Sequence, residues 1–165
     1  MKLTTYKNRD INFLLLRKSA ILSFILFFVL LSCSKSTDAP IATFTPQNIA
    51  FTLIGSGPYS GNAATSNLVI QNNTQWSNLM NELTPNVTNQ FTETNIDFNN
   101  FFLIAIIDQV RPNTSFSVNI ANIIENENNI VVRVNSSSSG SGYNVLTQPF
   151  RIVKIAKQTK PFVFQ

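Results

Sequence analysis

The run of seven apolar residues Phe101–Ile107 most constrains what this chain can fold into. A strand that faces water on one side alternates apolar and polar residues, whereas this run contains no polar residue. It is therefore apolar on both faces. We expect it to form a strand buried in the middle of a sheet.

Further strands are expected on both sides of this run, where apolar residues alternate with other residues or form short clusters. These segments are Ile49–Leu53, Leu68–Ile70, Phe116–Ile120, Ile130–Val134, Phe150–Ala156 and Phe162–Phe164. The Asn126–Asn129 turn lies between two of them and favours an antiparallel hairpin. Residues 86–100 are polar and irregular, and the Ser- and Gly-rich stretch 136–142 is expected to be mobile.

One clear helical pattern covers about residues 74–84. Its apolar side chains recur at i, i+3, i+4 and i+7, as Trp76, Leu79, Met80 and Leu83. Asn73 or Thr74 can cap its N-terminus, and Pro85 follows its end. We therefore predict an α+β domain, with a mainly antiparallel sheet of five to seven strands and this helix packed on one face.

The N-terminal segment resembles an export signal. A basic head precedes an apolar run of 13 residues, Ser19–Leu31, which is shorter than the about 20 residues that a membrane-spanning helix needs. Leu30-Leu31-Ser32-Cys33 then matches a bacterial lipobox. We predict a lipoprotein signal peptide over 1–32, a lipidated Cys33 (with palmitate among its acyl chains) on a flexible tether over 33–46, and one globular domain over 47–165. A plain signal peptide or an uncleaved anchor remains the alternative.

Removal of this signal changes the charge of the chain. Five of the 12 basic residues and one of the eight acidic residues precede Cys33, which leaves seven of each. The mature chain lacks the dense basic patch that nucleic acid requires, so we expect no nucleic-acid partner. Ser34 is not acidic, and the Asn-rich composition resembles that of lipoproteins of the Gram-negative outer membrane. We therefore expect an exported protein that its lipid holds on the outer membrane.

The residue types available exclude several kinds of chemistry. The chain has no histidine, and its one cysteine is Cys33. Ser-His-Asp and Cys-His catalysis and His or Cys metal sites are therefore excluded. A carboxylate pair of Asp97 with Asp108 or Glu93 stays open in principle, but solvated loop charges explain these residues as well. We expect no enzyme activity, no cofactor and no metal.

Three short blocks follow one another between residues 65 and 157. They are Trp76 with Leu79; Ile96-Asp97-Phe98 with the buried strand and Arg111-Pro112; and Thr147-Gln148-Pro149-Phe150 leading to Val153-Lys154-Ile155. In order and spacing these blocks resemble the C-terminal domain of the PrcB family, the small subunit of a bacterial protease complex. The resemblance implies a non-catalytic lipoprotein that associates with, or stabilises, a cell-surface subtilisin-like protease. Another envelope protein is the alternative partner.

The same resemblance directs attention to the loop after the buried strand. Its candidate partner-contact residues are Asp108, Arg111, Pro112, Asn113 and Thr114. The family usually has glycines after its Arg-Pro or Lys-Pro step, whereas this chain continues as Asn113-Thr114-Ser115-Phe116. An ordinary structural turn is the alternative interpretation of this loop.

Two further functions remain open. The loop Asp108–Ser115 resembles, through Pro112-Asn113-Thr114, the Pro-Thr loops that chagasin-type inhibitors insert into a protease cleft. Tyr59 and Tyr143 lie in Gly- and Ser-rich loops, where aromatic rings could stack on a sugar or another small ligand.

Overall fold

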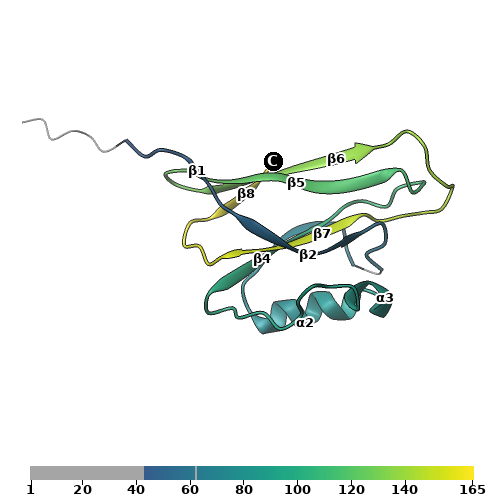
Figure 1. Cartoon of the computed structure of the whole chain (residues 1–165), viewed down its shortest axis with the longest axis horizontal. Coiled ribbons are helices and arrows are strands. Elements are labelled where there is room, and N and C mark those ends of the chain that lie inside the picture. Colours follow the sequence, from purple (N-terminus) through teal and green to yellow (C-terminus); the bar gives the residue numbers. More distant parts are fainter. Residues whose placement is uncertain (1–42, 62) are drawn as a thin grey trace, which may run out of the picture. The chain divides into compact units, whose positions relative to one another are not determined.

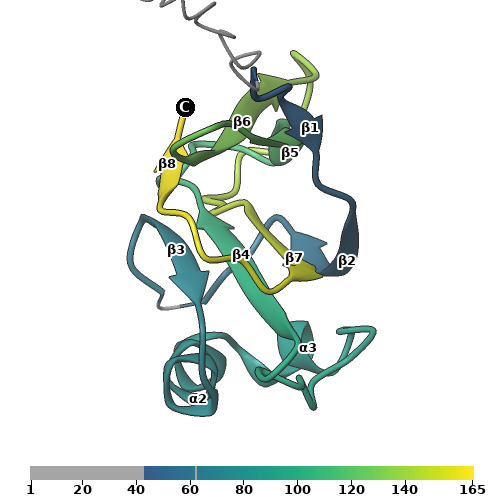
Figure 2. The ribbon, with the colours of Figure 1, turned by 90° about the vertical axis from the view of Figure 1, so that its left-hand side faces the viewer.

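The computed structural model describes residues 43–61 and 63–165, which fold into two sheets of four strands with two helices beneath them (Figures 1 and 2). We call the sheet that packs against the helices the inner sheet and the other one the outer sheet. The strands of the outer sheet, in spatial order, are β1 (Gln47–Asn48), β5 (Phe116–Glu125), β6 (Ile130–Ser138) and β8 (Phe162–Phe164). The inner sheet contains β2 (Phe51–Gly57), β7 (Phe150–Ala156), β4 (Phe101–Ile107) and β3 (Ser66–Ile70). The helices are α2 (Asn73–Glu82) and α3 (Pro85–Thr88).

The predicted buried strand is confirmed as β4, which lies between β7 and β3 in the inner sheet and pairs antiparallel with both. Its side chains alternate between two apolar cores. Leu103, Ala105 and Ile107 pack with α2 in the helix-side core. Phe102, Ile104 and Ile106 pack with the outer sheet in the inter-sheet core. Both faces of β4 are therefore buried, which explains why its sequence contains no polar residue.

The expected single sheet of five to seven strands is wrong, because the eight strands form two stacked sheets. The coarser expectation, a domain made mostly of strands with few helices, is confirmed. The hairpin of β5 and β6 folds over the second face of the inner sheet instead of extending it, and buries Val118, Ile120, Ile130 and Val132 in the inter-sheet core. The parallel strand β8 completes this layer beside β6.

The predicted helix is confirmed as α2, but it starts one residue earlier and ends at Glu82. Its N-cap is Asn72, whose Oδ1 accepts a hydrogen bond from the backbone N–H of Gln75 at 2.9 Å. Trp76 is buried, and its Nε1 donates to the carbonyl of Thr94 at 2.8 Å. Neither α2 nor α3 is long and apolar enough to cross a membrane.

Two segments expected to be irregular contain regular structure. Pro85 occupies the first turn of α3, where its missing N–H costs no hydrogen bond, so the proline that ends one helix begins the next. Strand β6 continues through Ser136–Ser138, where serine hydroxyls pair across the hairpin with Ser115 and Ser117 at 2.9–3.0 Å. Small hydroxyl side chains thus support strand pairing where the composition indicates a mobile loop.

The predicted signal peptide and Cys33 lie outside the described residues. Of the predicted tether, residues 43–46 are described and contain no strand or helix. The ring of Phe44 lies 4.1 Å from the Nζ atom of Lys160, so the last part of this segment contacts the outer-sheet side of the domain. Regular structure begins at Gln47.

Candidate functional site

The loop after β4 is joined to the segment before β7 by backbone hydrogen bonds. Arg111 and Thr147 exchange two of them, with N···O distances of 2.7 and 2.9 Å. The Thr147 side chain is buried, and its Oγ1 donates to the carbonyl of Asn113 at 2.8 Å. The two segments therefore form one ordered end of the domain, although 36 positions separate Arg111 from Thr147.

Within this end, Arg111 is held by side chains of the domain itself. Its Nε and Nη2 atoms donate to the two carboxylate oxygens of Asp108 at 3.0 and 3.1 Å, and Nη2 also donates to the Ser136 hydroxyl at 3.0 Å. The Ser136 hydroxyl donates in turn to Asp108 at 2.9 Å. The guanidinium lies 4.9 Å from the centre of the Phe116 ring. Arg111 and Asp108 thus stabilise the loop, and their charges are already satisfied.

The remaining predicted contact residues lie in the same turn. Asn113 Oδ1 accepts a hydrogen bond from the backbone N–H of Ser115 at 2.9 Å, which closes an Asx turn. The N–H of Thr114 donates to the carbonyl of Tyr143 at 3.1 Å, and the N–H of Tyr143 donates to Thr114 Oγ1 at 2.9 Å. Pro112 is exposed. The structure therefore brings all five predicted residues together, with four of them engaged internally.

Four large apolar side chains at this end are exposed to solvent. They are Val110, Tyr143, Val145 and Leu146, which we call the loop-end patch; Tyr143 is 83% exposed and Leu146 is 70% exposed. Val110 and Leu146 line a cleft of about 320 Å³ together with Tyr59. Sequence reasoning singled out Tyr59 and Tyr143 but missed Val110 and Leu146. In sequence each of them is only an apolar residue in a loop. Single apolar residues are common on protein surfaces, so this pattern does not mark a site.

The carboxylates considered for catalysis lie apart, each with its own partner. Glu93 forms an ion pair with Lys154, and Asp108 forms one with Arg111. Asp97 accepts hydrogen bonds from the Asn100 amide at 2.7 Å and from the backbone N–H of Asn99 at 3.0 Å. Donation from Asn100, and then from Asn99, holds the pKa of the Asp97 carboxyl below its ordinary value. These hydrogen bonds of Asp97 order the turn that precedes β4.

No group of three or more His, Cys, Asp or Glu side chains that could hold a metal ion is found within residues 43–61 and 63–165. Comparison with known proteins finds no family model, no curated protein and no solved structure that matches this chain.

Proposed function

We propose that this chain is a non-catalytic, lipid-anchored protein of the bacterial cell envelope that binds a partner protein through the loop-end patch. The resemblance to the PrcB family makes a cell-surface protease the partner class to test first. In this proposal Cys33 supplies the lipid anchor and residues 33–46 connect it to the domain, and the protein acts by binding or stabilising its partner.

The observation that carries the proposal is the set of exposed apolar side chains on an ordered loop end. Exposed apolar patches commonly mark interaction sites, and tyrosine is enriched among the residues that dominate binding energy. Hydrogen bonds from Thr114 and Thr147 already hold the loops that carry Tyr143 and Leu146. Less conformational entropy is therefore lost on binding than for a disordered loop.

The paired state of Arg111 changes which substitution is informative. Removing its guanidinium would leave the Asp108 carboxylate, whose side chain is 14% exposed, without its ion pair. A binding defect in such a variant would then report damage to the loop. Tyr143 and Leu146 are better probes because their side chains extend into solvent.

The test is affinity capture of C-terminally tagged, lipidated protein from detergent-solubilised membranes after mild crosslinking, read by mass spectrometry. We expect the wild-type protein to capture a protease in an amount comparable to its own. The double variant Tyr143→Ser/Leu146→Ser should no longer capture it. The control is Leu68→Ser, which removes an exposed apolar side chain from β3 in the inner sheet and should leave capture unchanged. Recovery of the lipoprotein alone, or equal capture by both variants, would overturn the proposal.

The activity of the captured protease distinguishes an accessory subunit from an inhibitor. An accessory subunit leaves the protease active or prolongs its lifetime, and the double variant shortens that lifetime. An inhibitor that inserts the loop around Pro112 into the cleft would instead suppress cleavage of a peptide substrate at micromolar concentration.

A further inference from the structure

A second surface lies along β2, one of the two edge strands of the inner sheet. Thr92 covers the middle of β2 at Leu53 and Ile54: its backbone N–H donates to the carbonyl of Ile54 at 3.0 Å, and its Oγ1 donates to the carbonyl of Leu53 at 3.0 Å. Beyond this point, no described residue hydrogen-bonds to the outer edge of Gly55–Gly57. Such an unpaired edge is a template for an added strand.

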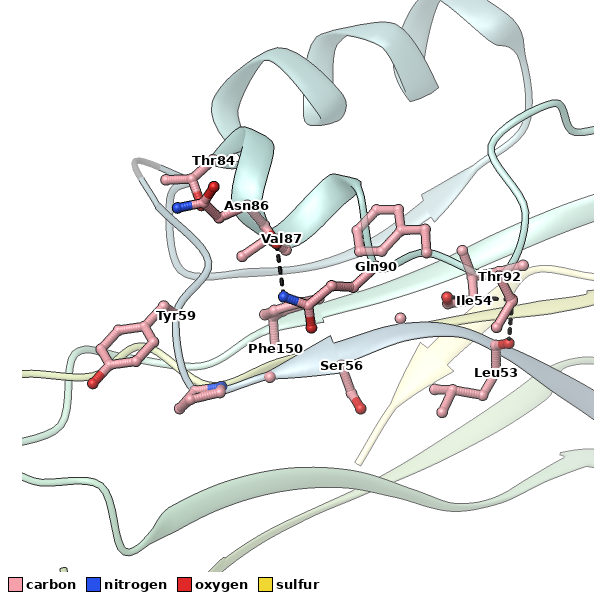
Figure 3. A pocket seen from close by; sticks show the side chains of 14 residues that line it. Leu53, Ile54, Ser56, Tyr59, Thr84, Asn86, Val87, Gln90, Thr92 and Phe150 are labelled. Atoms are coloured by element: carbon pink, nitrogen blue, oxygen red, sulfur yellow. Dashed lines mark hydrogen bonds between the residues drawn. The ribbon is translucent and has the colours of Figure 1, made fainter.

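A hollow of about 470 Å³ lies beside this open edge, between β2 and the segment Thr84–Thr92 (Figure 3). Val87, Phe91 and Phe150 are among the apolar residues that line it. Gly57 has no side chain to cover Phe150: a Cβ atom built at Gly57 would lie 3.1 Å from the Phe150 ring. The hollow is therefore open on the helix-side face of the sheet, where one side chain of an added strand would point.

On the opposite face of the same strands lies Arg151. It is paired with Ser56 on β2 and with Ile106 on β4. Because directly opposed residues share a face and Ile106 belongs to the inter-sheet core, the Arg151 side chain points toward the outer sheet. Figure 3 shows Ser56 on this same side, pointing away from the hollow.

The Arg151 side chain is half-buried and forms no hydrogen bond or ion pair with the side chains or backbone of the described residues, and its buried Nε atom has no partner among them. The other half-buried cations that could be compared are paired: Arg111 with Asp108, Lys154 with Glu93 and Lys160 with Glu125. Because a half-buried cation without an anion is unfavourable, Arg151 is a complementary site for a carboxylate from outside the domain.

We propose that β2 accepts an extended segment of a partner protein as an additional strand, with an apolar residue in the hollow and an adjacent Asp or Glu bound to Arg151. Successive side chains of a strand point to opposite faces, so one segment can satisfy both sites only if apolar and acidic residues alternate. The added strand lies two strand spacings, about 10 Å, from β7. Ser56 of β2 lies between Arg151 and the added strand. Because the serine side chain is small, the long side chain of Arg151 and a glutamate of the partner can meet across it. This site uses other residues than the loop-end patch and does not depend on the proposed function, although Tyr59 and Thr84 line both the hollow and the cleft beside that patch.

The probe is a fluorescein-labelled, end-blocked peptide, Glu-Val-Glu-Val-Glu, titrated into the full-length protein in detergent and followed by fluorescence anisotropy. We expect saturable binding, at least about tenfold tighter than that of Lys-Val-Lys-Val-Lys. A fully N-methylated version of the acidic peptide, which has no backbone donor, should not bind.

The matched protein variants are Arg151→Gln and Arg133→Gln, the latter removing an exposed arginine of β6. We expect Arg151→Gln to weaken binding of the acidic peptide by about tenfold and Arg133→Gln to leave it unchanged. Val87→Asp, in the wall of the hollow, should also weaken binding. No saturable binding at millimolar peptide, equal binding of the acidic and basic peptides, or equal effects of the two arginine variants would overturn the proposal.

Discussion

Two arginines at the same end of the inner sheet differ in what surrounds them. Arg111 donates hydrogen bonds to Asp108 and Ser136 and lies over the Phe116 ring, whereas the buried Nε atom of Arg151 has no partner within residues 43–61 and 63–165. Breaking a partly buried ion pair leaves one charge uncompensated, while removing an unsatisfied polar atom eliminates a cost. The same substitution should therefore lower stability at position 111 and not lower it at position 151.

We expect Arg111→Met to lower the free energy of unfolding by about 1–3 kcal/mol, because Asp108 loses its ion pair. Arg151→Met should leave the free energy of unfolding unchanged or raise it by up to about 1 kcal/mol, because methionine keeps much of the apolar stem. Urea denaturation of both variants and the wild type measures the difference. Equal destabilisation by the two substitutions would contradict the described surroundings of Arg151.

At the scale of elements, β2 depends on the absence of a side chain at Gly55. A Cβ atom there would lie 2.3 and 2.4 Å from two atoms of the Phe91 ring, which is closer than carbon atoms approach without displacement. Phe91 also packs against Trp76 and Phe150, with ring centres 6.0 and 6.2 Å apart. The glycine thus allows the segment after α3 to pack directly on the edge strand.

Gly55→Ala should lower the free energy of unfolding by about 1–3 kcal/mol, because Phe91 must leave its position between two other rings. Gly57→Ala is the matched control on the same strand: its Cβ would lie 3.1 Å from the Phe150 ring, so a smaller displacement is needed. Thermal unfolding followed by circular dichroism compares the two. A Gly57→Ala variant as unstable as Gly55→Ala would show that glycine is needed along β2 for another reason.

The elements themselves could be predicted wherever side-chain periodicity reports burial. The unbroken apolar run of β4 and the four helically spaced side chains of α2 each mark a buried surface. Periodicity fails for Ser136–Ser138, because serine pairs that stabilise the hairpin are indistinguishable by composition from a linker. It also fails for Pro85, since a proline after one helix is equally suited to begin the next.

At the scale of the molecule, the sequence could not show that the strands divide into two sheets. The alternating pattern of β5 and β6 says that one face is buried, but a neighbouring sheet and a helix bury that face equally well. The candidate site has the same limit. The loop at Asp108–Ser115 and its Asp108 could be located in sequence. Two further partners of Arg111, Ser136 and Thr147, are distant in sequence, and only the tertiary fold brings them close.

Because β4 supplies side chains to both cores, the two layers should unfold together. Leu103 and Ile104 are fully buried neighbours that face the helix-side core and the inter-sheet core respectively. Trp76, the single tryptophan of the chain, reports on the helix-side core alone. A substitution in the inter-sheet core should nevertheless shift the unfolding transition that Trp76 fluorescence reports. Once β4 unfolds, the inner sheet against which α2 packs is lost.

We expect Ile104→Ala to lower the free energy of unfolding by about 2–5 kcal/mol, the usual cost of such a cavity. The midpoint from Trp76 fluorescence and the midpoint from circular dichroism of the strands should shift by the same amount in urea, as a two-state domain requires. Leu103→Ala, one residue away and on the other face, should behave alike. If Ile104→Ala moved the circular dichroism midpoint but left Trp76 fluorescence at its wild-type midpoint, the two cores would be independent folding units and β4 would not couple them.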